Sequence, residues 1–517
     1  MSVISLKFLF FLLAALIVYY LLPAKLQWIW LLITSLGFYY INATPLQFLF
    51  FIIYVVVNWA ASRFLSNENA YRKQVFRGTL IFDVLVLVLF KYSGFFYGIY
   101  CNIGHVLGLN LSSQGAELTI SQIELLAPAR ISYFALIIIG YLTDVYWGKY
   151  EGQKNVGKLI LFTGYFPQMT SGPIVKYDTM MQQLASETKK KFNYEKFASG
   201  SIRILWGIFK KLVISERCAI VVSTVYSYYD VYSGLYIVLA AAMFAMQLYT
   251  DFSGLMDIVL GASEVLGIEL PENFDTPFYS TSLSEFWRRW HITLGGFLRE
   301  YVFYPVQRSE AFRKLRKWCK KTFGKDYESK CNLPVYLGLF ASWFLIGLWH
   351  GGGWNYIFGV GLYMWLIIVS GELFTPLFKR LILLFKINTE CFSWRLFQRV
   401  RTFFIFIFGL SFFRAASLRE GFHMWKAAFS SFNPWIFFDE SIYTLGLEKE
   451  EFQICLIGLL IVLIVSMIQQ KGQVRTLLMK QNFVFRLIII TLLVVSIVIY
   501  GCYGSEYHAA DFIYGRF

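Results

Sequence analysis

The sequence predicts an all-α, polytopic integral membrane protein. Hydrophobic residues make up 57% of its 517 residues and charged residues only 15%, whereas soluble domains carry about 25% charged residues. The mean hydropathy is +0.55. Apolar runs of membrane-spanning length recur along the chain, for example at 6–22, 454–467 and 487–499. These runs lack the apolar–polar alternation of transmembrane β-strands, so the spans are expected to be helices of about 20 residues each.

We expect about eleven or twelve transmembrane helices, together with re-entrant and interfacial helices. The expected spans cover residues 5–22, 27–43, 47–64, 79–98, 131–147, 203–226, 235–262, 333–350, 354–373, 401–416, 452–468 and 487–503. The first run has no small-x-small cleavage site, so it reads as an uncleaved span. The stretch 157–175 contains Pro167 and Gly172-Pro173. It is too broken to span the bilayer and is expected to be re-entrant or interfacial.

Charge predicts how the chain is oriented, because Lys and Arg concentrate in cytoplasmic loops. Segment 101–129 has no Lys or Arg and segment 427–451 is acidic, so both are expected to be extracytoplasmic. Segment 307–332 is strongly basic and is expected to be a cytoplasmic loop or amphipathic helix. This threading places the N-terminus outside and makes residues 1–517 one membrane domain. The net charge of +15 follows from the same bias and gives no reason to expect a nucleic-acid partner.

The first functional candidate is His350. The apolar run 333–348 ends at Trp349-His350, three glycines follow, and another apolar run begins near Asn355. Glycine permits a sharp turn, and non-helical backbone at membrane depth is tolerated only where it is buried or lines a cavity. Histidine titrates near neutral pH, which suits it to act as a general base on a hydroxyl. The alternative is an interfacial histidine that caps a helix.

The second candidate is the segment 284–301, which contains WRRWH. On one helix its large apolar side chains would share a stripe: Trp287, Trp290, Leu294 and Phe297. Arg288 and His291 would lie off that stripe, a pattern typical of an interfacial or partly inserted helix. An arginine there can neutralise a phosphate or carboxylate. The alternative is an interfacial helix without a catalytic part.

Two carboxylates, Asp251 and Asp257, lie within the apolar segment 235–262. Charges at membrane depth are costly and need partners, so we expect structural ion pairs, with the arginines of 284–301 as candidate partners. The segment PQMTSGPI at 167–174 predicts a structural turn. No metal-ligand cluster, disulfide framework, phosphate-binding glycine loop or serine nucleophile elbow appears, so no metal site is expected.

Taken in this order, these segments resemble the membrane-bound O-acyltransferase family. The similar segments are PQMTSGPIVKY (167–177), QLYTDFSGLMDIVLG (247–261), LPENFDTPFYSTSLSEFWRRWHITLGGFLREYVFYPV (270–306), GLWHGGGWNYIFGVGLY (347–363) and the ending DFIYGRF (511–517). The bacterial branch of alginate O-acetylation membrane proteins is the more similar one, in length, in the region 377–451 and in the ending. The D-alanyl transfer protein of teichoic acid D-alanylation is the second choice. This sequence has three glycines after His350 and differs there from many relatives.

The resemblance implies that His350 is the active-site histidine and that His291 is the second histidine of the central signature. Their neighbours Trp287, Arg288, Trp349 and Asn355 are the candidate substrate-binding residues. The implied donor is a cytoplasmic thioester, acyl-CoA or an acyl carrier protein, which is a substrate rather than a bound cofactor.

The implied acceptor is an extracytoplasmic polysaccharide or a teichoic acid, reached from a bacterial plasma membrane, and the acyl group is most simply acetyl. An extracytoplasmic esterase-like acetyltransferase is the implied partner protein. One alternative is a transporter or flippase for a lipid-linked sugar, although no inverted repeat is visible. Another is a non-catalytic scaffold, for which His350 would be dispensable.

Overall fold

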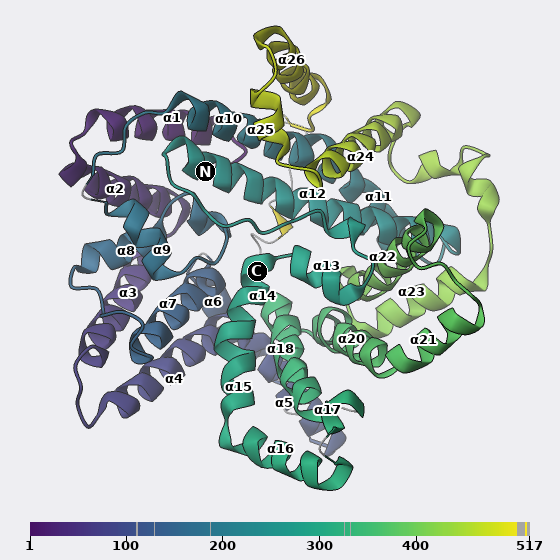
Figure 1. Ribbon diagram of the computed structural model, residues 1–517, viewed down its shortest axis with the longest axis horizontal. Helices are drawn as coiled ribbons and strands as arrows, with labels where there is room; N and C mark the ends of the chain where they lie inside the picture. The colour runs from purple at the N-terminus through teal and green to yellow at the C-terminus, as the bar shows by residue number, and fades with distance from the viewer. Residues whose placement is uncertain are drawn as a thin grey trace.

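Helices are the regular secondary structure of the part of the protein that the structure describes. Figure 1 shows a computed structural model that describes residues 1–517 except 110–111, 129, 187, 325, 331, 504–511 and 514–517. Apart from helices, these residues form one isolated β-bridge, between Phe274 and Trp290. The predicted all-α class is therefore confirmed. Of the ending DFIYGRF, only Phe512 and Ile513 are described, and the rest of that predicted motif lies outside the described residues.

Most of the N-terminal helices, purple to blue in Figure 1, gather on the left of the view, whereas α5 lies at the lower centre near α17 and α18. They are α1 (Leu6–Leu21), α2 (Ala24–Asn42), α3 (Pro45–Leu65), α4 (Arg72–Lys91), α5 (Ser93–Val106), α6 (Gln114–Leu125), α7 (Ile131–Tyr146), α8 (Val156–Gly164), the 3-10 turn η1 (Gln168–Thr170) and α9 (Tyr177–Leu184). The stretch 157–175 contains only the short α8 and η1, which confirms that it is too broken for a span.

The middle of the chain supplies the central helices and the segments around the two candidate histidines. These elements are α10 (Tyr194–Phe209), η2 (Lys210–Ser215), α11 (Glu216–Ser227), α12 (Leu235–Val265), η3 (Pro277–Tyr279), α13 (Leu283–Arg289), α14 (Ile292–Leu298), η4 (Arg299–Phe303), α15 (Tyr304–Arg308), α16 (Glu310–Phe323), α17 (Tyr327–Lys330) and α18 (Leu333–Gly351). The predicted basic segment 307–332 therefore does contain a helix, α16, rather than an extended loop.

The C-terminal third, green to yellow in Figure 1, completes the fold. Its elements are α19 (Trp354–Tyr356), η5 (Ile357–Leu362), α20 (Tyr363–Leu373), α21 (Thr375–Leu384), α22 (Phe392–Arg414), α23 (Leu418–Ser430), η6 (Pro434–Phe437), η7 (Ser441–Thr444), α24 (Lys449–Gln469), α25 (Val474–Met479) and α26 (Phe483–Tyr500). The acidic segment 427–451 includes two 3-10 turns. Its side of the membrane, the orientation of the N-terminus and the single domain stay predictions.

The 31-residue helix α12 lies at the centre, and α10 and α11 pack along it (Figure 1). Gly200 and Gly207 of α10 face Gly261 and Gly254 of α12. A Cβ added at Gly207 would lie 2.5 Å from the carbonyl oxygen of Gly254. Such small residues let membrane helices approach backbone to backbone. The close contact brings the charged side chains of α10 and η2 beside the carboxylates of α12.

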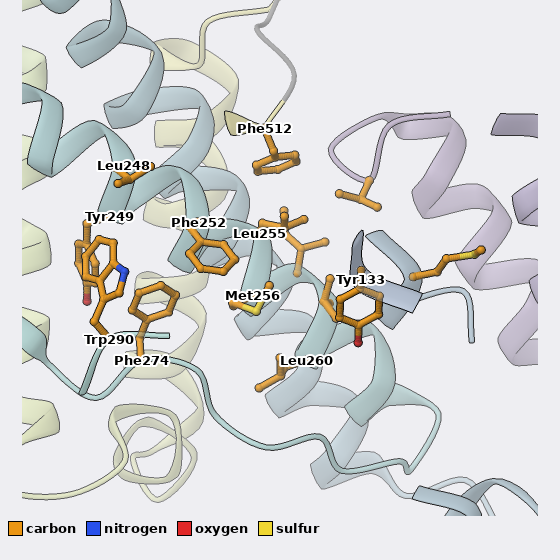
Figure 2. Close-up of a cluster of buried hydrophobic side chains, with 14 of the residues drawn as sticks. Tyr133, Leu248, Tyr249, Phe252, Leu255, Met256, Leu260, Phe274, Trp290 and Phe512 are labelled. Atoms are coloured by element: carbon orange, nitrogen blue, oxygen red, sulfur yellow. The ribbon is translucent and has the colours of Figure 1, made fainter. Parts of the chain in front are cut away.

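One continuous cluster of buried apolar side chains extends through the fold and includes Phe512. Figure 2 shows Phe512 near Phe252 and Leu255 of α12. The backbone N–H of the next residue, Ile513, donates a hydrogen bond of 2.8 Å to Asp251. Phe512 and Ile513, the last described residues, therefore pack against the central helix α12.

Seven helical segments among the described residues are long and apolar enough to span a membrane. They are α3, α12, α18, Trp354–Leu373, α22, α24 and α26. The pair α4 and α5, bent by 75°, would make an eighth. These are fewer than the eleven or twelve predicted. Helices α1 and α7 have only 16 residues each, and the expected span 203–226 is interrupted by η2.

Three of the short elements, η2, η4 and η5, are π-helical turns. Such turns occur as single wide turns within α-helices and are frequent at functional sites. Here η2 carries Lys210 and Lys211, η4 follows the helix after His291, and η5 packs against the histidine-bearing helix α18.

Candidate active site

His350 lies in the last turn of α18 and is almost fully buried, at 2% exposure. The helix ends because Gly352 adopts a left-handed conformation with φ of 65°. A Cβ at Gly352 would lie 2.9 Å from Cδ1 of Tyr92, so the turn also needs glycine for space. The predicted glycine turn after His350 is thus present, and it packs directly on the α4–α5 bend.

His291 does not lie on one continuous helix, so the prediction for 284–301 is wrong on this point. Helix α13 ends at Arg289, Trp290 forms the bridge with Phe274, and α14 begins at Ile292. The interruption arises because a segment before α13 runs alongside and bonds to the backbone on both sides of His291. Ile292 donates to Asn273 (3.1 Å) on one side. On the other, Asp275 donates to the Arg289 carbonyl (2.9 Å).

The break turns the His291 ring into the core instead of leaving it off an interfacial stripe. Its ring centre lies 4.8 Å from that of Phe252, and Phe252 packs on Phe274 at 5.1 Å (Figure 2). The side chain is 7% exposed. Burial lowers the pKa of His291 to about 3, because a buried imidazolium loses its hydration. His291 is therefore neutral near pH 7.

Trp349 connects the two histidines. Its ring centre lies 5.9 Å from that of His291 and 5.0 Å from that of His350. His291 and Trp349 also line a small inner cavity of about 20 Å³. Gly172, from the segment PQMTSGPI, and Phe252, from the segment QLYTDFSG, line the same cavity. The structure therefore brings together residues from all four segments that the sequence singled out.

A much larger chamber of about 910 Å³ adjoins this inner cavity. Ile174 lines both spaces, and its backbone N–H donates a hydrogen bond of 3.0 Å to Thr293, which also lines the chamber. Thr293 is only two residues from His291. The chamber and the inner cavity thus share a wall beside the second histidine.

Charged residues lie along the chamber wall. Lys149 pairs with Asp144 at 2.7 Å and with Glu300 at 2.6 Å, and Lys176 pairs with Glu300 at 2.7 Å. Partial burial alone would raise the pKa of Glu300, but the two ammonium groups outweigh it and hold the pKa below the usual value of 4.5. Arg299 and Arg308 line the chamber as well. Glu269 is a third carboxylate in the lining, so cations exceed carboxylates at the chamber wall by one.

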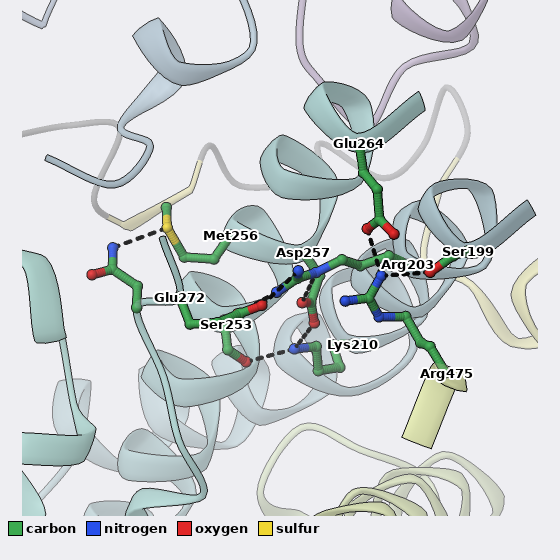
Figure 3. A network of polar contacts seen from close by, with 10 residues as sticks. Ser199, Arg203, Lys210, Ser253, Met256, Asp257, Glu264, Glu272 and Arg475 are labelled. Atoms are coloured by element: carbon green, nitrogen blue, oxygen red, sulfur yellow. Dashed lines mark hydrogen bonds and ion pairs between the residues drawn. The ribbon is translucent and has the colours of Figure 1, made fainter. Parts of the chain in front are cut away.

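Asp251 and Asp257 form buried ion pairs, as predicted, but with other partners than expected. Asp251 pairs with Lys211 at 2.7 Å. Asp257 pairs with Arg203 at 2.8 Å and with Lys210 at 2.6 Å, a network shown in Figure 3. The partners come from α10 and η2 rather than from the arginines of 284–301, because the glycine contacts press α10 against α12. These carboxylates therefore hold the central helices together through ion pairs.

Three of the predicted substrate-binding residues lie outside both cavities. Trp287 packs on Trp343 with ring centres 5.0 Å apart. Arg288 is exposed. Asn355 is buried, and its amide donates to the Ala415 carbonyl at 2.9 Å. Trp349 is the one of the four that lines the inner cavity, and the binding roles of all four stay predictions.

Sequence reasoning missed Lys91. Its ammonium donates a hydrogen bond to the Trp349 carbonyl, beside His350. A signal was available, since this lysine lies within the expected span 79–98. Tyr133, which lines the inner cavity from α7, was also missed, and nothing in the sequence around it distinguishes it from other buried aromatic residues.

Residues 155–418, just over half of the chain, match the family model described as MBOAT, membrane-bound O-acyltransferase family. The chain belongs to the membrane-bound O-acyltransferase family. Both histidines and most residues of the two cavities lie in the matched region, whereas Lys91 and Tyr133 precede it. Family membership together with the spanning helices makes this a multi-pass membrane protein.

Three relatives of this family member illustrate the range of the similarity. A probable alginate O-acetylase of Pseudomonas syringae pv. tomato is 30% identical over 69% of this chain and 60% of its own length. A peptidoglycan O-acetyltransferase of Helicobacter pylori is 29% identical over 56% and 54%, respectively. A teichoic acid D-alanyltransferase of Bacillus subtilis is 28% identical over 46% and 58%. The chain thus matches less than two thirds of the length of each.

Proposed function

We propose that this protein takes an acyl group, most simply acetyl, from a cytoplasmic thioester and moves it toward a hydroxyl of an extracytoplasmic cell-surface polysaccharide. The observation that carries the proposal is that His291 and Trp349 line an inner cavity that shares a wall with a large chamber, while His350 packs against Trp349 with ring centres 5.0 Å apart. A donor could fill the chamber while its acyl end reaches the histidines. The plasma membrane is the proposed location.

The reaction needs one proton to move from the acceptor to the leaving group. In the proposed mechanism the His350 imidazole accepts the proton of the acceptor hydroxyl, and the hydroxyl oxygen forms a bond to the thioester carbonyl carbon. The C–S bond then breaks, and the imidazolium returns the proton to the departing thiolate, so a thiol and an ester result. Such positioned proton transfer contributes about 10²–10⁴-fold in rate. Neutral His291 is proposed to hydrogen-bond the reacting groups from the other side of Trp349.

The chamber suits a donor that carries phosphate and a long, flexible arm. Lys149, Lys176, Arg299 and Arg308 line its wall beside three carboxylates, which leaves a small excess of positive charge that favours an anionic ligand. Acyl-CoA and the phosphopantetheine arm of an acyl carrier protein share this chemistry. The inner cavity, of about 20 Å³, holds little more than one water-sized group, so we propose that the acyl end that reaches it is short. An extracytoplasmic esterase-like transferase is the proposed partner that completes transfer to the polymer.

D-alanyl transfer to teichoic acid is the second candidate. It is favoured by the similarity to the teichoic acid D-alanyltransferase of Bacillus subtilis. The two candidates differ in the acid that mild alkali releases from the acceptor. Acetate supports the first and D-alanine the second.

The deciding experiment replaces His350 and His291 by alanine in the native host. We expect ester-linked acyl groups on cell-surface polymers to fall to the level of a deletion strain in His350→Ala and to be strongly reduced in His291→Ala. His423→Ala is the matched control, because His423 is exposed on α23 and lies outside both cavities. Protein level in the membrane is measured in parallel.

Full acylation in a normally expressed His350→Ala strain would contradict the catalytic proposal and favour a scaffold. Accumulation of a lipid-linked sugar in the deletion strain, with acyl groups unchanged, would instead favour a transporter or flippase.

A further inference from the structure

Lys91 places a positive charge next to the histidine-bearing turn. It is the last residue of α4, at the point where α4 and α5 bend by 75°. Its ammonium donates a hydrogen bond to the carbonyl oxygen of Trp349. The same ammonium lies 5.1 Å from the centre of the Trp349 ring and 5.7 Å from that of Tyr92.

A cation at this depth is costly unless something compensates it. The one carboxylate on the same helix, Asp83, is two turns away and is held by Asn58 at 3.1 Å. The contacts described for Lys91 are with a backbone carbonyl and two aromatic faces. Both kinds of group compensate a positive charge, the carbonyl as the negative end of a helix dipole and the rings through their quadrupoles.

The carbonyl of Trp349 belongs to the last turn of α18, where carbonyls lack partners within the helix. Lys91 therefore caps the helix that carries His350. The neighbouring residue Tyr92 makes a second connection, because its ring fills the space where Gly352 would carry a Cβ. Two consecutive residues at the α4–α5 bend thus hold the two sides of His350, one through a charge and one through packing.

We propose that Lys91 is a positioning residue for acyl transfer: its ammonium fixes Trp349 and, through it, the orientation of the His350 ring that packs against Trp349. This inference rests on the proposed function of His350. The chamber proposed for the donor is built from other elements, mainly α7, α14 and η4. Loss of the ammonium therefore lowers the rate of transfer and leaves donor binding largely intact. A displacement of about 1 Å at such a site can cost about 10²-fold in rate.

The test compares Lys91→Met, which keeps the length but not the charge, with Lys91→Arg, which keeps the charge. The control Lys379→Met lies on the exposed helix α21. Ester-linked acyl groups on cell-surface polymers and protein level are measured in cells that produce each full-length variant. We expect Lys91→Met to lose about 10²-fold in acylation rate at normal protein level, Lys91→Arg to recover a substantial part, and Lys379→Met to match the wild type.

A second measurement separates positioning from a general structural defect. Inverted membrane vesicles are supplied with radiolabelled acetyl-CoA, and the rate of label transfer to endogenous acceptor is followed against its concentration. We expect the maximal rate to fall in Lys91→Met with the apparent KM within about twofold of the wild type. Wild-type acylation in cells with Lys91→Met, or Lys91→Arg no better than Lys91→Met, would overturn the inference. If His350→Ala is inactive in those same cells, the proposed function survives that result.

Discussion

His291 adopts a left-handed backbone conformation, with φ of 48° and ψ of 50°, that residues other than glycine seldom adopt. Strain of this kind costs about 1–3 kcal/mol and persists where the surroundings impose it. The sequence identified the residue but not its conformation, because the backbone bonds that interrupt the helix come from residues 273–275. The same holds for Asp251 and Asp257. The sequence predicted that these carboxylates need cationic partners, but it did not predict which lysines and arginines supply them.

Replacing His291 tests both the strain and the buried imidazole. His291→Asn keeps a residue type that tolerates the left-handed region, and we expect it to abolish most acylation without lowering the thermal unfolding temperature at pH 7.5. The folded pKa of about 3 lies below the usual 6.5. The unfolded chain therefore binds the proton first, and stability falls as pH drops below about 6.5, by at most about 1.4 kcal/mol per pH unit. His291→Asn should weaken the pH dependence of stability between pH 7.5 and 5. An unchanged pH dependence would contradict the lowered pKa of His291.

The buried pair between Lys211 and Asp251 gives a second prediction at this scale. Lys211→Met leaves Asp251 and Glu216, both of which now contact the ammonium, without their cation. Breaking a buried pair from one side costs about 3–5 kcal/mol. We expect a much lower thermal unfolding temperature in detergent, with partial recovery in the double variant Lys211→Met, Asp251→Asn. No recovery would show that Glu216 is the more important partner.

Helices α10 and α12 show which parts of the fold can be predicted at the scale of elements. The sequence predicted α12 almost to its ends, as residues 235–262, because its apolar run is long and is not broken by the two carboxylates within it. It predicted 203–226 as one span, although this region contains the end of α10, the turn η2 and helix α11. Hydropathy does not reveal the turn η2. Lys210 and Lys211 lie within the predicted span, and their charges are paired inside the protein rather than exposed in a loop.

The glycine contact between these helices should be intolerant of even one methyl group. Gly207→Ala places a Cβ 2.5 Å from the Gly254 carbonyl oxygen, so the helices must separate, at a cost of about 1–3 kcal/mol. Gly78→Ala in α4 is the control, because a Cβ there has no neighbour within 4 Å. We expect it to be neutral or to stabilise by up to about 1 kcal/mol. Thermal unfolding of the two purified variants measures the difference, and equal unfolding temperatures would refute the close contact.

Across the whole molecule, the site is assembled from both the matched family region and the helices that precede it. Residues 155–418 contribute His291, Trp349 and Ile174, whereas Lys91 and Tyr133 come from α4 and α7. Segment order and the histidines could be predicted from the sequence. The cavities could not, because their walls join residues separated by more than 150 positions, such as Tyr133 and Trp349.

The shared wall at Ile174 predicts how acyl length is limited. Ile174→Trp fills the space between the chamber and the inner cavity, so we expect strongly reduced acylation at normal protein level. Ile174→Ala enlarges it and should allow transfer of a propionyl group, measured as propionate released by mild alkali from cells fed propionate. Ile457→Ala, exposed on α24 and outside both cavities, serves as the control. Unchanged products in both Ile174 variants would mean that the acyl group takes another route.

The π-helical turns η2, η4 and η5 also have a consequence for how the chain accommodates insertions and deletions. A π-helical turn holds one residue more than the α-helical turn it replaces, which is the structural trace of a single-residue insertion. Deleting one residue inside η2 should restore regular winding and leave the side chains that follow in phase, whereas a deletion in the regular part of α11 would rotate them by about 100° around the axis. After the deletion in η2, Arg217 should therefore keep its ion pair with Glu451. Relatives of different length are therefore expected to place their one-residue gaps at these turns, and a chimaera joined there should keep its flanking helices in phase.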